Sequence, residues 1–214
     1  MYSWITKRFA VLIAGAAVVL IFQGCSRNQN PGRSQAISRD PVLQERAQKD
    51  ASFLSADSPL VPKARSEFHG LSYYPIDPNL RFSVPLRRHQ TPAQVRLGTN
   101  TGEIRTALRY GYFDFKVQNR DCRLQVYRLE DNPEGGGPSL FIPFRDATSG
   151  QETYGAGRYI DLRENTSGIY DLDFNRAYNP FCAYNNEFSC PVPPAENTLN
   201  VPIRAGEKKF PGTN

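Results

Sequence analysis

The sequence predicts a mainly β domain, an antiparallel sandwich or partly open barrel, with one N-terminal helix and a long ordered C-terminal loop. Three observations predict this class. Between residues 80 and 174, short segments alternate apolar and polar residues. Clusters of Gly, Asn and Pro separate these segments at close spacing, as in antiparallel sheets. No helical pattern lies between them, which excludes the crossover helices of a parallel sheet.

The helix is predicted to begin after Asp40, because an acidic N-cap followed by Pro41 is a typical helix start. The residues that follow give it a weakly apolar face, made by Val42, Leu43, Ala47, Ala51, Phe53 and Leu54. We expect the helix to end before Ser58-Pro59, since the residue before a proline disfavours helical conformation.

Strands are expected wherever the alternation is clear. The expected ranges are 80–86, 94–97, 104–110, 113–117, 122–130, 140–144, 158–162, 169–174 and 199–203. The apolar residues change face at Gly111, which indicates a tight turn or a β-bulge. The aromatic, Asn- and Pro-rich stretch from Asn175 onward is expected to form an ordered loop that wraps on the sheet.

The N-terminus follows the plan of an export signal. Lys7 and Arg8 precede an apolar run over 9–22, which is shorter than the roughly 20 residues of a spanning helix. Gln23-Gly24-Cys25 then resembles a lipobox, which predicts a signal peptide at 1–24 and lipidation of Cys25. The alternative is an N-terminal transmembrane anchor with an incidental cysteine.

This interpretation divides the chain into a signal peptide (1–24), a flexible tether (25–39) and a single domain (40–214). The membrane is then a partner through the lipidated Cys25, and Ser26 favours the outer membrane, facing the periplasm. Loss of Lys7 and Arg8 lowers the net charge from +5 to about +3. So small a surplus, together with export, argues against a nucleic-acid partner.

Three cysteines remain in the mature domain. Cys182 and Cys190 flank a short loop and are expected to form a disulfide in an oxidising compartment; the alternative is two unpaired buried thiols. Cys122 has no partner nearby in the sequence and is expected to be a buried thiol. No metal site is predicted, because zinc would require a cluster of His or Cys.

Four dense motifs occur in order in the second half of the chain. They read F-x-D-x-T-S-G-x-x-T-Y-x-x-G-R-Y from Phe144, D-F-N-x-A-Y-N-P from Asp173, C-P-x-P-P-x-E-N from Cys190 and A-G-E-K from Ala205. This set resembles the uncharacterised family domain of unknown function 1684 (DUF1684), from about residue 40 to the C-terminus. The resemblance implies a single domain, often exported or lipid-anchored, and implies no activity.

These motifs supply the candidate ligand-binding residues, which are Asp146, Thr148, Tyr154, Arg158, Asp173, Asn175, Tyr178 and Glu196. Aromatic walls with a few directional polar groups are typical of a small-molecule pocket. We therefore expect an envelope protein that binds a small molecule or a protein partner without catalysis. No cofactor is expected, because no Walker-type or Rossmann glycine loop is present.

Two alternatives remain open. An envelope hydrolase could use a carboxylate pair or a hard cation held by Asp146, Asp173, Glu196 or Glu207. A purely structural lipoprotein would use the same acids in turns, with Arg158 neutralising one of them. A serine hydrolase is disfavoured, since the chain has only two histidines and no G-x-S-x-G elbow.

Overall fold

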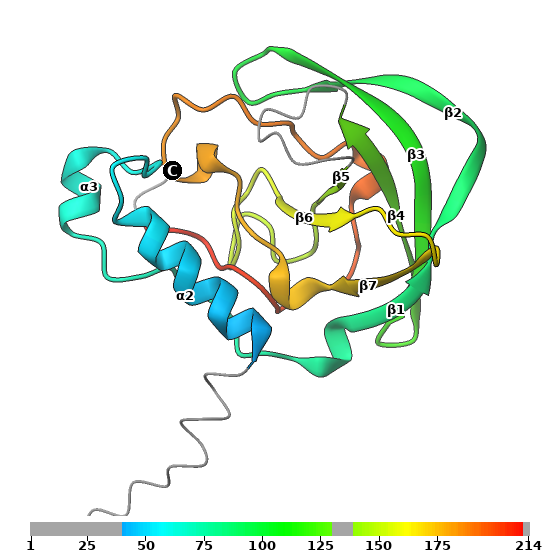
Figure 1. Cartoon of the computed structure of the whole chain (residues 1–214), viewed down its shortest axis with the longest axis horizontal. Coiled ribbons are helices and arrows are strands. Elements are labelled where there is room, and N and C mark those ends of the chain that lie inside the picture. Colours follow the sequence, from blue (N-terminus) through cyan, green and yellow to red (C-terminus); the bar gives the residue numbers. More distant parts are fainter. Residues whose placement is uncertain (1–39, 130–138, 212–214) are drawn as a thin grey trace, which may run out of the picture.

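The computed structural model of the chain describes residues 40–129 and 139–211 (Figure 1). The predicted signal peptide, the tether and Cys25 lie outside the described residues. Within the described part, no helix is both long enough and apolar enough to cross a membrane.

Two antiparallel sheets form the domain, which confirms the predicted mainly β class. The larger sheet has the order β2-β3-β4-β5-β6, with β2 (Arg87–Gly98), β3 (Ile104–Val117), β4 (Arg120–Leu129), β5 (Ser139–Phe144) and β6 (Arg158–Arg163). The smaller sheet pairs β1 (Arg81–Pro85) with β7 (Ile169–Asp173), and β1 lies against β3. Sandwich-like stacking of this kind buries one face of each sheet.

The main core lies between the two sheets. Phe174, fully buried just after β7, is at its centre, with ring contacts to Phe82 of β1, Phe115 of β3 and Phe144 of β5. These contacts join both sheets, so burial of aromatic surface holds the β1–β7 pair on the larger sheet. The start of the long C-terminal segment is thereby tied to the core.

The phase change at Gly111 is a β-bulge, as predicted. The pairing of β3 with β4 shifts register between Arg109 and Gly111. A Cβ added at Gly111 would lie 2.6 Å from the carbonyl oxygen of Arg87, so only glycine allows β2 to approach this closely.

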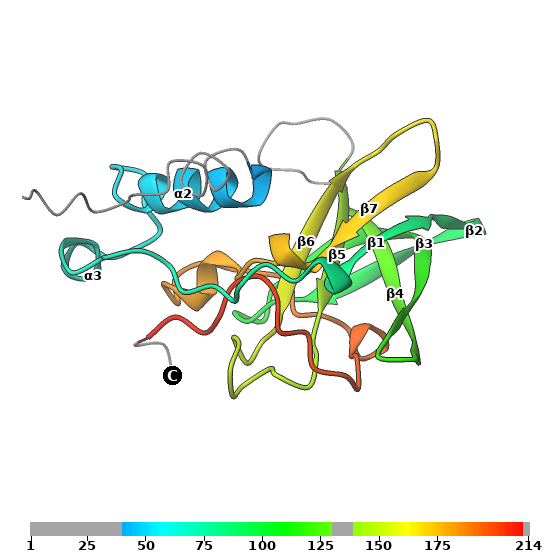
Figure 2. The same ribbon diagram turned by 90° about the horizontal axis from the view of Figure 1, so that it is seen from below.

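The N-terminal helix is also confirmed. Helix α2 (Pro41–Phe53) begins at Asp40, whose side chain accepts a hydrogen bond of 2.9 Å from the Val42 amide. Its end is fastened by Phe53, which is 1% exposed and packs edge-on against Tyr184. A second, five-residue helix, α3 (Pro62–Ser66), was not expected. Figure 2 shows both helices at one end of the molecule and β2 at the other.

Two predicted strands need correction. Strand β2 begins at Arg87 rather than at residue 94, because an edge strand with exposed polar side chains lacks the alternation that reveals a buried one. The predicted strand over 199–203 is wrong, although its alternate residues are buried. Its backbone groups bond instead to the loop at Arg145 and Asp146 and to the buried side chain of Arg158.

Candidate functional site: a pocket beneath helix α2

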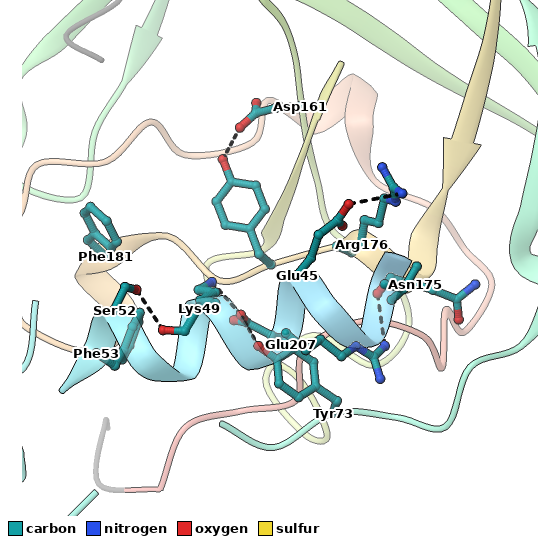
Figure 3. Close-up of a pocket in the computed structure, with 14 residues that line it drawn as sticks. Glu45, Lys49, Ser52, Phe53, Tyr73, Asp161, Asn175, Arg176, Phe181 and Glu207 are labelled. Atoms are coloured by element: carbon teal, nitrogen blue, oxygen red, sulfur yellow. Dashed lines mark hydrogen bonds and ion pairs between the residues drawn. The ribbon is translucent and has the colours of Figure 1, made fainter. Parts of the chain in front are cut away.

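A pocket of about 330 Å³ lies between α2 and the segment that follows β7 (Figure 3). One wall is the helix, from Val42 to Phe53, and the other is the run from Asn175 to Phe181. Tyr73 and Glu207 also line it.

Helix geometry explains why charged residues face this pocket. With 3.6 residues per turn, Val42, Glu45, Arg46, Lys49 and Phe53 share one face of α2. The two apolar members at the ends are buried. Arg46 and Lys49, between them, are therefore partly buried against the body of the protein, over the pocket, while Glu45 lines it from an exposed position.

Glu207 is a buried carboxylate with a full set of donors. Its side chain is 1% exposed and accepts hydrogen bonds from Lys49 Nζ (2.5 Å), the Asn179 amide (2.7 Å) and the Tyr184 hydroxyl (2.5 Å). A buried charge is tolerated only when it is paired and hydrogen-bonded in this way. Burial, with Glu207 adding to it, raises the pKa of Tyr184, which therefore remains a protonated donor.

Lys49 joins this carboxylate to the aromatic wall. Its ammonium lies 4.9 Å from the centroid of the Tyr178 ring, within cation–π range, and its side chain is 23% exposed. In Figure 3, Lys49 points from α2 toward Glu207. The lysine is therefore both the ion-pair partner of a buried acid and a charged group at the pocket surface.

Arg46 fastens the helix at the other end of the pocket. Its guanidinium donates to the carbonyl oxygens of Tyr74 and Asn175, each at 3.0 Å, and lies 4.5 Å from the centroid of the Tyr73 ring. Partial burial lowers its pKa, against the opposing effect of nearby Tyr73. Its buried Nε has no hydrogen-bond partner among the described residues.

The buried pair Asp146–Arg158 holds the segment that carries Glu207. Arg158 is 1% exposed and donates to the Asp146 carboxylate (3.1 Å) and to the carbonyl oxygens of Ile203 (2.8 Å) and Glu207 (3.1 Å). Burial lowers the pKa of Arg158, and Asp146 opposes that shift. The pair thus positions the backbone of Glu207 without reaching the pocket itself.

Asp146 has no free oxygen to offer a ligand. Besides Arg158, it accepts hydrogen bonds from the Thr148 amide (3.0 Å) and hydroxyl (2.6 Å) and from the Ile203 amide (2.8 Å). Thr148 is itself buried and hydrogen-bonds to Thr153. In the motif that begins at Phe144, Asp146 and Thr148 therefore close a turn. This is the structural role that the sequence left as an alternative.

Asp173 does not line the pocket but holds Asn175, which does. Its carboxylate accepts from the amide (2.9 Å) and side-chain nitrogen (2.8 Å) of Asn175, which in turn accepts from the Asp77 amide (2.8 Å). Asn175 and Tyr178 line the pocket. They are the predicted site residues that the structure places there.

The remaining predicted residues lie elsewhere. Tyr154 donates to the carbonyl oxygen of Cys182 at 3.5 Å. Glu196 accepts from Tyr127 (2.5 Å) and Arg109 (2.5 Å) in a separate network. The eight candidates therefore do not converge on one cavity. The carboxylate-pair hydrolase stays a prediction, and no contact among residues 40–129 and 139–211 lends it support.

Cys182 and Cys190 are adjacent, and both are free thiols in this structure. The Cys182 amide donates to Cys190 Sγ at 3.3 Å. Their predicted disulfide stays a prediction, and Cys122 is buried as expected. In the described ranges, no group of three or more His, Cys, Asp or Glu is placed to hold a metal ion.

Sequence reasoning missed Arg46 and Lys49 on the helix side of the pocket and Tyr73 outside the helix. It considered Glu207 only for a carboxylate pair or a hard-cation site. A signal was present. Arg46 lies four positions after Val42, and Lys49 lies four positions before Phe53 and three after Arg46. Val42 and Phe53 face inward, so all four share one face. Basic residues on the inward face of a helix indicate acceptors on the body of the protein.

Comparison with known proteins agrees with the motifs. The model of the family described as "Protein of unknown function (DUF1684)" matches residues 66–208. The chain belongs to the DUF1684 family. A solution NMR structure of an uncharacterized protein from Haloarcula marismortui is similar at 36% identity, with a TM-score of 0.60, over 83% of this chain and 94% of that one. No curated protein matches the chain significantly.

The match also locates the pocket within this DUF1684 protein. Asn175, Tyr178 and Glu207 lie inside the matched residues 66–208, whereas α2 precedes them. The pocket is therefore formed where the N-terminal helix covers the family domain.

Proposed function

We propose that this DUF1684 protein is a lipid-anchored cell-envelope protein that binds a small molecule in the pocket beneath α2. The observation that carries the proposal is the pocket itself. Its volume of about 330 Å³ suits a small ligand, and it combines aromatic rings with a few positioned polar groups. Two residues of the predicted binding face, Asn175 and Tyr178, contribute to it.

The hydrogen-bond inventory favours a ligand that carries an acceptor group. Glu207 is saturated by its donors, and Glu45 is paired with Arg176 at 3.2 Å. Lys49 Nζ has three N–H donors and one acceptor within the described part of the chain, Glu207 Oε1. A carboxylate, phosphate or hydroxyl group next to Lys49 would accept hydrogen bonds from its remaining N–H donors. The rest of the ligand would lie against Tyr178.

Lipidation would place this pocket close to a membrane. Residues 25–39 precede α2, and a 15-residue tether spans at most about 50 Å when extended. Val42 and Glu45, in the first turns of α2, line the pocket. The predicted tether therefore joins the domain at the helix that forms one wall of the binding site.

Ser52→Trp tests the binding site. Ser52 lines the pocket from an exposed position on α2, so an indole there would fill the cavity without disturbing the core. Ala51→Trp is the matched control, because Ala51 is the neighbour of Ser52, is exposed on the same helix and does not line the pocket. We expect small acidic and polyhydroxylated compounds, screened by ligand-observed NMR, to bind the wild-type chain and Ala51→Trp but not Ser52→Trp. Equal binding to all three proteins, or none to the wild type, would refute the site.

Cys25→Ser tests the anchor separately. In the bacterial host, the wild-type chain should incorporate radiolabelled palmitate and partition with detergent-extracted membranes. The Cys25→Ser chain should lose the label and appear in the soluble envelope fraction. Equal labelling of both chains would contradict lipidation at Cys25 while leaving the pocket untested by that result.

A further inference from the structure

We infer that Cys182 and Cys190 form a dithiol–disulfide couple that exchanges with small disulfides, with Cys190 as the attacking thiol and Cys182 as the resolving one. This inference is independent of the ligand proposed for the pocket. It rests on the contact between the two cysteines, their unequal exposure and the way their loop is held.

The contact already places the two cysteines side by side. Cys182 lies in the short turn η3 (Phe181–Ala183), and its amide donates to Cys190 Sγ at 3.3 Å. The chain closes a loop of only a few residues between them. Bond formation therefore requires a change of side-chain conformation rather than a search through the chain.

The two thiols differ in the way that such a couple requires. Cys190 is partly exposed, whereas Cys182 is 2% exposed. Hydrogen bonds from the Cys182 thiol and from backbone amides stabilise a thiolate at Cys190 and lower its pKa, in opposition to burial. The same hydrogen bond and burial raise the pKa of Cys182. The thiolate is the nucleophile, so Cys190, the more exposed residue of the two, is also the more reactive one.

The loop between them is held by contacts that do not involve sulfur. The Asn100 side chain donates to the Phe188 carbonyl (3.0 Å) and accepts from the Cys190 amide (2.7 Å), and Ser189 donates to Glu103 (2.7 Å). These bonds fix the loop on the turn between β2 and β3. The dithiol and disulfide forms can therefore share one backbone, which allows exchange in the folded protein.

The exchange takes two steps. The Cys190 thiolate attacks one sulfur of a small disulfide, the S–S bond breaks, and one small thiolate leaves, giving a mixed disulfide on Cys190. Cys182 then gives its proton to solvent and attacks the Cys190 sulfur, and the second small thiolate leaves. The two cysteines lose two electrons in total, and the small disulfide is reduced to two thiols.

Oxidised glutathione provides a direct test on the reduced, purified full chain, in a Cys25→Ser background. Samples are quenched with acid, alkylated and mapped by mass spectrometry. The native chain should form an internal Cys182–Cys190 disulfide, and reduced glutathione in excess should reopen it. Cys182→Ser should accumulate glutathione on Cys190, and Cys190→Ser should react at least about tenfold more slowly.

Cys122→Ser is the control, because Cys122 lies on β4, is buried, and burial raises the pKa of its thiol. It should behave as the parent chain does. Three outcomes would overturn the inference. They are oxidation of the pair only after denaturation, a Cys182–Cys190 disulfide that excess reduced glutathione leaves closed in the folded chain, and glutathione accumulating on Cys182 in preference to Cys190.

Discussion

At the residue scale, the polar residues of the motifs mainly pair with and position one another. Arg158 and Asp146 are both buried and hold the backbone of the segment that carries Glu207, and Glu207 in turn pairs with Lys49 of α2. The sequence predicted Asp146 and Arg158 as candidate binding residues, and one of its alternatives had Arg158 neutralise one of four acids, without saying which. It could not predict Lys49 as the partner of Glu207, because 158 positions separate the two residues in the chain.

Arg158→Met tests this arrangement. The substitution roughly keeps the volume but removes the cation that pairs with the buried Asp146 carboxylate and the donor to the carbonyl oxygens of Ile203 and Glu207. Removing one partner of a buried ion pair costs about 3–5 kcal/mol, so the free energy of unfolding in urea should fall by that amount. Arg204→Met is the control, since its pair with Glu152 is exposed and contributes about 0–1 kcal/mol. Equal losses in both variants would contradict the account.

At the scale of elements, the periodicity of apolar residues predicted those helices and strands that bury one face. Helix α2, β1 and the bulge at Gly111 follow from capping and alternation. Periodicity did not predict the start of β2, because an edge strand has few buried side chains. It also failed at the irregular 199–203 stretch, because there a buried side chain, Arg158, replaces a neighbouring strand as hydrogen-bond partner.

The bulge gives a prediction at this scale. A methyl group at Gly111 would lie 2.6 Å from the Arg87 carbonyl oxygen, so Gly111→Ala should push β2 away and cost roughly 1–3 kcal/mol of unfolding free energy. Gly98→Ala adds the same atom to β2 with nothing within 4 Å, and should stay within about 0.5 kcal/mol of the wild type. Thermal and urea unfolding measure both. A Gly111→Ala protein as stable as Gly98→Ala would refute the close approach.

At the scale of the whole molecule, buried and partly buried tyrosines lie at the helix end, the pocket and the sheet. Burial is the first cause that raises the pKa of Tyr74 to about 12, and it also raises the pKa of Tyr73, Tyr127, Tyr154 and Tyr159 above 10.0. The unfolded chain releases these protons near pH 10, whereas the folded chain retains them. The contribution of each tyrosine to stability is therefore complete below pH 10 and is lost as pH rises through the raised pKa of its folded state, which for Tyr74 is about 12.

In an alkaline titration, unfolding and ionisation of these tyrosines should occur together. Circular dichroism and the ultraviolet absorbance of tyrosinate should change together in a steep transition above pH 10, while the denatured chain titrates gradually around pH 10. Gradual ionisation of most tyrosines with the circular dichroism unchanged would show that they are accessible in the folded protein.

The central claim is that a small ligand binds between α2 and the wall after β7. The most direct measurement is a map of amide ¹H–¹⁵N chemical shifts of the full chain, recorded as the strongest screening compound is added. The account predicts that the saturating shifts cluster on Arg46–Phe53 and Asn175–Phe181. Shifts centred instead on the Glu196–Arg109 network, or spread evenly over the sheet, would contradict it.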